Sequence, residues 1–236
     1  VLPLDGLDSL SGRKLLSSVT DLQDEQWLYI HGISRGHPLV LELINRGASA
    51  TAFHETLENY VTVEIFSKLS AEQKRVLSAL SIFREPVSID ALSEQQLNID
   101  TLDSLVEQGL ARQVDSEIYD VHDLIREFLL RSIDDQTKFE LHAKCSNWYK
   151  KSSQTPGFTI ELIFHLLSSD NMVDATSMII DNGRILISQG HMELLGLIES
   201  INTADISQEM LAKILQFKGE ILSLLGRFEE AKEAFG

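Results

Sequence analysis

Residues 110–123 read LARQVDSEIYDVHD. Two short runs rich in apolar and β-branched residues, Leu110–Val114 and Ile118–His122, flank the polar triplet Asp115–Glu117, and this pattern predicts a β-hairpin. Asp123 follows the second run, and we expect it to cap a helix whose apolar residues recur at helical spacing. The stretch therefore predicts a hairpin that leads directly into a helix.

Three helices are predicted before this hairpin. Ser70 and Gln73 form a capping-box pattern at the start of the first helix. Ser88 is expected to cap the second helix and Asn98 the third, which Gly109 ends. Three helices, a hairpin and a further helix predict a winged-helix domain over residues 69–132. Because the same fold serves different functions, it does not by itself select one.

The segments on either side are predicted to be helical. Residues 1–68 form a helical subdomain, with a break at Gly36-His37-Pro38, where the proline begins a new helix. Residues 133–236 form antiparallel helical repeats with short loops. Their last part spaces small and large residues as in a tetratricopeptide unit: Leu215, Gly219, Leu222, Gly226, Ala231 and Phe235. The sequence thus predicts a mainly α protein with a small β wing, in three parts.

Charge and composition restrict the function classes. The formal net charge is −16, a field that repels nucleic acid and anionic membranes. The predicted third helix of the winged helix carries Asp100, Asp103 and Glu107 without any Lys or Arg, which argues against DNA recognition. A single cysteine, Cys145, is expected to be a buried structural thiol. With no signal peptide or membrane span predicted, we expect a cytoplasmic protein.

Motifs for catalysis or metal binding are missing from the sequence. It contains no Walker phosphate loop, no G-x-G-x-x-G, no H-E-x-x-H and no G-x-S-x-G. The seven histidines lack metal-ligand spacing with cysteine. The adjacent carboxylates at 134–135 and 229–230 are interpreted as helix caps or exposed charges, and Arg126 and Arg131 as ordinary surface ion-pair partners. We therefore expect no catalytic or metal site in this chain, and we interpret it as a fragment that is not itself an enzyme.

The order of these segments resembles the part of STAND-class signal-transduction ATPases that follows the nucleotide-binding core. This group is related to the NB-ARC switch proteins and to regulators of the maltose type. The resemblance is carried by Gly36-His37-Pro38-Leu39, the winged helix, Val121-His122-Asp123 and the helical repeats after it. It covers essentially the whole chain.

Two residues match motifs of that family. Pro38 matches the proline of its Gly-x-Pro motif, which packs near the adenine, and His122 matches the histidine of its Met-His-Asp motif, which contacts the β-phosphate of ADP. Val121 stands where the family has methionine. An imidazole can donate a hydrogen bond to phosphate, so the assignment is chemically sensible. Taken alone, Pro38 is also explained as a helix start, and His122 as a cap or a buried histidine.

The resemblance implies a regulatory part of a nucleotide-dependent switch. The lid (residues 1–68) and the winged helix would help to hold ADP or ATP, with Mg²⁺, bound to a P-loop core that this chain lacks, and the fragment alone is not expected to bind nucleotide tightly. The intact parent is then expected to be an ATPase whose helical repeats bind a protein or small ligand. Two alternatives stay open. One is a non-enzymatic scaffold of helical repeats, and the other is a winged-helix DNA-binding regulator.

Overall fold

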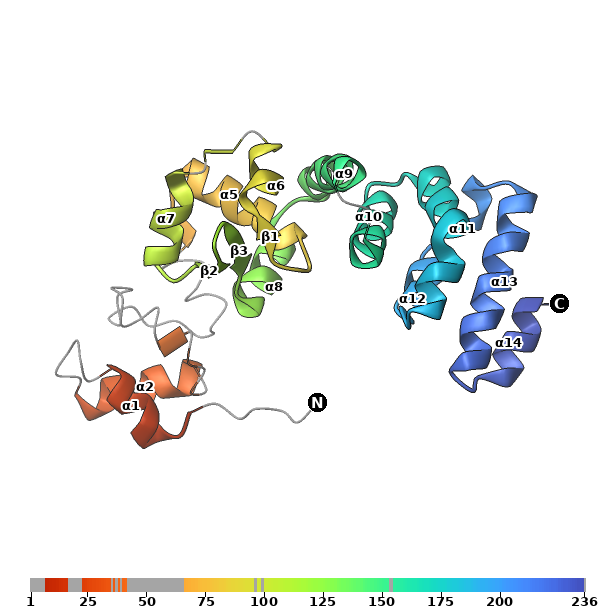
Figure 1. The fold of residues 1–236 in the computed structure, drawn as a ribbon. Helices are drawn as coiled ribbons and strands as arrows, with labels where there is room; N and C mark the ends of the chain where they lie inside the picture. The colour runs from red at the N-terminus through yellow and green to blue at the C-terminus, as the bar shows by residue number, and fades with distance from the viewer. Residues whose placement is uncertain are drawn as a thin grey trace. The chain divides into compact units, whose positions relative to one another are not determined.

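The computed structural model describes residues 7–16, 23–34, 36, 38, 40–41, 66–95, 97–98, 100–152 and 155–235. Within these residues the chain forms 12 α-helices and one three-stranded antiparallel sheet (Figure 1), so the prediction of a mainly α protein with a small β wing is confirmed. The chain divides into two compact units, residues 1–132 and residues 133–236. A separate helical subdomain over residues 1–68 stays a prediction.

Unit 1 begins with helices α1 (Ser9–Leu16) and α2 (Asp24–Ser34). Their apolar faces meet in a small core that also includes a residue after the break: Leu16, Trp27, Ile30 and Leu41. The indole Nε1 of Trp27 donates a hydrogen bond to Ser9 Oγ at 2.9 Å, which satisfies the one polar atom that the ring brings into the core. Thus α1 and α2 are held together by both packing and a directed bond.

Helix α1 is capped by the side chain of the residue before it. The carboxylate of Asp8 accepts hydrogen bonds from the backbone N–H of Leu10 and of Ser11, both at 2.9 Å, so Asp8 is the cap. A carboxylate directly before a helix is well placed to reach the free N–H groups of its first turn.

The second part of unit 1 contains the expected helices. After a short 3₁₀ turn (Phe66–Lys68) come α5 (Ala71–Ile82), α6 (Ile89–Ser93) and α7 (Asp100–Glu107). The capping box at α5 is confirmed, since Gln73 N donates to Ser70 Oγ at 3.1 Å and Ser70 N donates to Gln73 Oε1 at 2.9 Å. Asn98 Oδ1 accepts from Asp100 N at 3.1 Å, so the predicted cap of α7 is confirmed as well.

The sheet has the order β1-β3-β2, with β1 (Val87–Ser88), β2 (Ala111–Asp115) and β3 (Ile118–Val121). The predicted hairpin of β2 and β3 is confirmed, whereas β1, which pairs antiparallel with β3 across Val87 and Tyr119, was not predicted. A strand of two residues is too short to show alternation in the sequence. Helix α8 (Asp123–Ser132) follows β3 and packs against α5.

Unit 2 is a row of helices in which neighbours along the chain pack together, as Figure 1 shows. They are α9 (Asp135–Lys151), α10 (Pro156–Ser168), α11 (Met172–Ser188), α12 (Leu194–Glu199), α13 (Gln208–Leu224) and α14 (Phe228–Phe235), with a 3₁₀ turn at Thr203–Asp205. Gly183, in the middle of α11, lies against the ring of Phe217 from α13, where a Cβ would be only 3.0 Å from the ring carbons.

The repeat pattern at the end of the chain corresponds to real packing. Gly219 in α13 lies so close to the ring of Phe235 in α14 that a Cβ there would overlap it. Ala231 is buried, and Gly226, with φ +75°, lies between the two helices. Small residues therefore let α13 and α14 approach closely, as the tetratricopeptide spacing predicts. Within the described residues, no helix has the length and apolarity needed to cross a membrane.

Candidate functional site

The Gly-x-Pro segment is built on a backbone pairing between two distant parts of unit 1. Leu7 N donates to Gly36 O at 2.8 Å, and Gly36 N donates to Ser34 Oγ at 3.2 Å. Gly36 has φ +72°, and a Cβ on it would overlap the carbonyl oxygen of Leu7. Only glycine fits here without strain. Pro38, two residues later, is helical and exposed, whereas His37 and Leu39 lie outside the described residues.

His122 lies between the end of β3 and the start of α8. Its carbonyl accepts the first hydrogen bond of the helix, from Arg126 N at 2.9 Å, so His122 occupies the N-cap position and Asp123 is the first helical residue. The interpretation of Asp123 as the cap was wrong by one residue. The imidazole is half-buried, and its Nδ1 atom is inaccessible to water. Whether His122 and Pro38 share one site stays a prediction.

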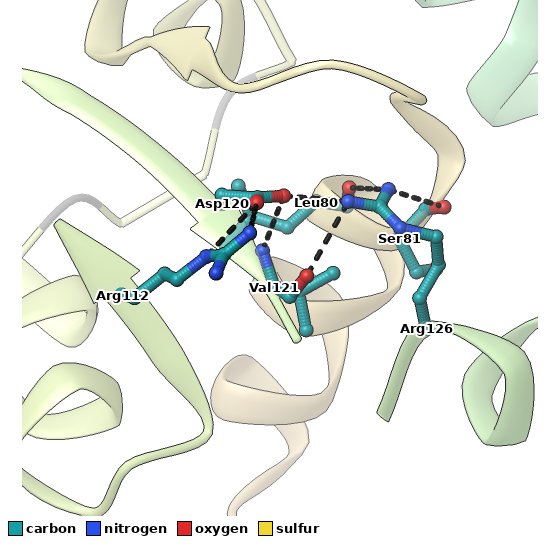
Figure 2. A network of polar contacts seen from close by, with 6 residues as sticks. All are labelled: Leu80, Ser81, Arg112, Asp120, Val121 and Arg126. Carbon is teal, nitrogen blue, oxygen red and sulfur yellow. Dashed lines mark hydrogen bonds and ion pairs between the residues drawn. The ribbon is translucent and has the colours of Figure 1, made fainter. Parts of the chain in front are cut away.

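A buried carboxylate lies two residues before His122. Asp120 is only 5% exposed. Its Oδ2 accepts from Arg112 of the neighbouring strand, with Nε at 3.0 Å, and its Oδ1 accepts from Arg126 of α8 at 2.5 Å (Figure 2). Oδ1 also accepts from Val121 N at 2.8 Å. Two guanidinium groups and one amide thus surround this carboxylate, as a buried charge requires.

Arg126 extends the same network to α5. Its Nη1 donates to the carbonyls of Leu80 and Ser81, at 3.4 and 3.3 Å, and its Nη2 donates to the carbonyl of Val121 at 3.4 Å (Figure 2). The last carbonyls of a helix have no partner within it, and a cation there also interacts favourably with the helix dipole. The interpretation of Arg126 as an ordinary surface partner was therefore wrong, since its side chain is only 14% exposed.

Arg131 and the acidic residues of α7 lie on the surface, as the sequence predicts. Arg131 pairs with Glu127 on the surface of α8 at 3.7 Å. The acidic side chains of α7 (Asp100, Asp103 and Glu107) are all exposed, and their spacing places them on one face of the helix. Any nucleic acid that approached this face would meet three negative charges.

The residues considered for chemistry have structural roles. Asp134 caps α9 by accepting from Thr137 N at 2.9 Å, and Glu230 pairs with Arg227. Cys145 is fully buried, which confirms the interpretation of its thiol. The described part of the chain contains no cluster of three or more His, Cys, Asp or Glu side chains placed to hold a metal ion.

One polar pair in unit 2 was missed by sequence reasoning. His142 of α9 and His165 of α10 meet through their Nδ1 atoms at 2.9 Å, and both side chains are buried. The ring of His165 also stacks on Tyr149, and His142 meets Phe164 edge-on. Burial, assisted by the charge of Lys138, lowers the pKa of His142 from 6.5 to about 4. Nothing in the spacing of these histidines signals that the two helices bring them together.

Comparisons with known proteins agree with this architecture. The structure is similar to the crystal structure of a signal transduction ATPase with numerous domains (STAND) protein with a tetratricopeptide repeat sensor from Pyrococcus horikoshii, with a TM-score of 0.66 and 23% sequence identity. The similarity covers 98% of this chain and 35% of that one, so the chain spans about a third of that protein's length. No protein-family model and no curated protein matches the sequence. The fold therefore resembles part of a STAND signal-transduction ATPase.

Proposed function

We propose that the chain is the regulatory part of a nucleotide-dependent signalling switch. In this proposal a P-loop core of the same protein binds ADP or ATP with Mg²⁺, and Pro38 and His122 complete the nucleotide site. The helical repeats of unit 2 bind the protein or small ligand that activates the switch. The observation that carries the proposal is the place of His122 at the β3–α8 junction, in a fold similar to part of a STAND protein.

The surroundings of His122 suit contact with a phosphate. The imidazole is partly accessible to water and lies at the N-terminus of α8, a ten-residue helix. Backbone N–H groups at a helix N-terminus and the helix dipole favour an anion, and a protonated imidazole adds a charge-assisted hydrogen bond. A β-phosphate at this junction would therefore tie the winged helix to ADP.

In this mechanism the switch depends on differential contacts. Gly36 fixes the turn that presents the exposed Pro38, which would pack against the adenine in both nucleotide states. The contact of His122 to the β-phosphate stabilises the closed, ADP-bound state. Exchange of ADP for ATP removes the advantage of that state, and the population shifts towards the open one.

A scaffold function for the helical repeats is the second candidate. Leu224, Leu225, Phe228 and Phe235 at the end of unit 2 are each 47–70% exposed, which suits contact with a further apolar surface. In this alternative the winged helix has no nucleotide to sense. The two candidates differ in one respect that is easy to check: a switch requires a phosphate-binding loop in the natural protein, and a scaffold does not.

Replacing His122 with alanine is expected to weaken the retention of ADP in the natural-length protein. The loss of one hydrogen bond to a charged phosphate corresponds to about a tenfold faster release. The measurement is the release rate of a fluorescent ADP analogue after mixing with excess ADP. His191→Ala, in unit 2, is the matched control and should leave the rate unchanged. Unchanged release from His122→Ala would contradict the proposal.

The 236-residue chain by itself is expected to show no ATP turnover above background, because its sequence has no phosphate-binding loop. Phosphate release at micromolar chain concentrations is the assay. Robust turnover that persists through repeated purification would show that this chain contains a catalytic site and would overturn the assignment.

A further inference from the structure

We propose that Asp120 and Arg126 form a positioning pair that sets the direction of the His122 side chain. The inference rests on the proposed function for its consequence, nucleotide retention, but the positioning itself is testable without nucleotide. Neither residue is placed in contact with the ligand. They act through His122, because their side chains hold the peptide groups on either side of Val121, the residue before it.

The hydrogen bonds around His122 explain how the pair acts. The peptide groups that flank Val121 are both held, since Val121 N donates to Asp120 Oδ1 at 2.8 Å and Val121 O accepts from Arg126 Nη2 at 3.4 Å. His122 O accepts from Arg126 N at 2.9 Å. The side chains of Asp120 and Arg126 thus hold the backbone just before His122, and the first backbone hydrogen bond of α8 holds the carbonyl of His122. These bonds restrict φ and ψ at His122, and backbone φ and ψ in turn restrict the χ1 rotamers that its side chain adopts.

The same pair joins three elements at the junction. Asp120 lies in β3 next to its last residue, Arg126 lies in the first turn of α8, and the guanidinium of Arg126 reaches the carbonyls of Leu80 and Ser81 at the end of α5 (Figure 2). Asp120 and Arg126 are 5% and 14% exposed, so their attraction is screened only weakly by solvent. Arg112, the other partner of Asp120, is 57% exposed. The Asp120–Arg126 bond is therefore the inner and more constrained of the two.

The Asp120–Arg126 pair contributes more to the geometry of the β3–α8 junction than to the stability of the fold. A buried ion pair contributes little net stability compared with apolar residues of the same shape, because both charges lose their hydration. Its bonds are directional, however, and the guanidinium plane must satisfy a carboxylate and three carbonyls at once. A one-residue shift or a rotation of α8 against β3 would break this set. The pair thus selects one arrangement of the junction that holds His122.

The first test uses the 236-residue chain and no nucleotide. Three-bond NMR couplings to Cγ of His122 report its χ1 distribution, and we expect one dominant rotamer in the wild type. Asp120→Asn keeps the shape of the carboxylate but removes its charge, and Arg126→Lys keeps the charge but removes the planar fork. Both are expected to give averaged couplings. Asp103→Asn, an exposed carboxylate on α7, is the matched control.

Two results would overturn the positioning role. One is a single, wild-type rotamer of His122 in folded Asp120→Asn and Arg126→Lys. The other is a lowered melting temperature in these variants with unchanged couplings, which would show that the pair only stabilises the fold. Arg126→Lys retains a cation beside Asp120. If Asp120→Asn does not fold, the couplings of His122 can therefore still be measured in Arg126→Lys.

The second test separates this inference from the proposed function. In the natural-length protein, release of the ADP analogue is compared for the wild type, Asp120→Asn, His122→Ala and the double variant. If Asp120 acts through His122, Asp120→Asn speeds release in the wild type, by up to the roughly tenfold effect of losing the phosphate hydrogen bond, and has no further effect in His122→Ala. Two results refute positioning. One is that Asp120→Asn speeds ADP release equally in the wild type and in His122→Ala. The other is that Asp120→Asn leaves release unchanged although His122→Ala speeds it strongly. No effect of His122→Ala refutes the proposed function instead.

Discussion

Between pH 6.5 and pH 4, unit 2 is expected to lose roughly 3 kcal/mol of stability because of its buried histidine pair. In the folded chain the pKa of His142 is lowered to about 4, mainly by burial and then by the charge of Lys138, whereas the unfolded chain binds the proton near 6.5. Below pH 6.5 the unfolded state therefore binds protons that the folded state does not. The free energy of unfolding therefore decreases as the pH is lowered from 6.5 to about 4.

The geometry of the pair gives a second reason for the loss. With both rings neutral, one Nδ1 donates and the other accepts across 2.9 Å. One added proton brings a charge between α9 and α10, where Tyr149 and Phe164 provide aromatic surroundings. A second proton makes both Nδ1 atoms donors, so the hydrogen bond is lost. The contact between α9 and α10 is thus where acid should open unit 2.

The prediction is tested by urea unfolding at several pH values. Trp148 in α9 reports unit 2 when Trp27 of unit 1 is replaced by phenylalanine. His142→Asn places an amide near the position of Nδ1 without a titrating group, and we expect its stability to depend less on pH between 6.5 and 4. His191→Asn serves as the control, because it removes a histidine that contacts Glu193 and does not belong to the His142–His165 pair. A wild-type pH dependence in His142→Asn would refute the prediction.

Replacing Gly36 with alanine is expected to disrupt the start of unit 1. The positive φ of +72° alone costs about 1–2 kcal/mol for a residue with a Cβ. That Cβ would also overlap the carbonyl of Leu7, so the bond from Leu7 N to Gly36 O has to break, which adds about 1 kcal/mol. Leu7 then separates from the core around Trp27. Hydrogen exchange at the Leu7 amide should accelerate by roughly 30- to 160-fold, given about 2–3 kcal/mol in all.

The neighbouring glycine supplies a control for this experiment. Gly32 lies in the exposed interior of α2, and a Cβ on it would meet nothing within 4 Å. Gly32→Ala is therefore expected to stabilise α2 by about 0.5–1 kcal/mol through helix propensity. The same substitution four residues apart thus has opposite signs. If both variants show the same exchange rate at Leu7, the turn at Gly36 does not constrain this segment.

Local features were predicted well because their causes lie within a few residues. The capping box of Ser70 and Gln73, the cap at Asn98 and the hairpin of β2 and β3 all form as expected. Each depends on a side chain that reaches its own neighbouring backbone or on a short alternation of apolar residues. The errors were also local, such as the cap of α8, which belongs to His122 and not to Asp123. There the sequence offered two adjacent polar residues, and the helix start depended on where β3 ended.

The candidate site was predicted only as positions along the chain. Gly36, Pro38 and His122 were identified by motif, but neither the pairing of Gly36 with Leu7 nor the network around Asp120 followed from any motif. One signal was available for the latter, because Arg112 and Asp120 are direct partners in a hairpin whose strands were predicted. Opposite charges across a hairpin are expected to meet. The role of Arg126 required knowing where α5 ends.

Apart from the two-residue strand β1, the sequence by itself determined the kinds of element and their order: helices, a wing, and helical repeats with small residues at close contacts. These follow from periodicity, capping and turn chemistry, which act over short distances along the chain. Only the tertiary structure decided which distant side chains meet. It bonds Arg126 both to Asp120 and to the end of α5, brings His142 to His165, and places Gly183 against Phe217. Such contacts depend on how elements pack, and many packings are compatible with the same local pattern until burial and charge select one.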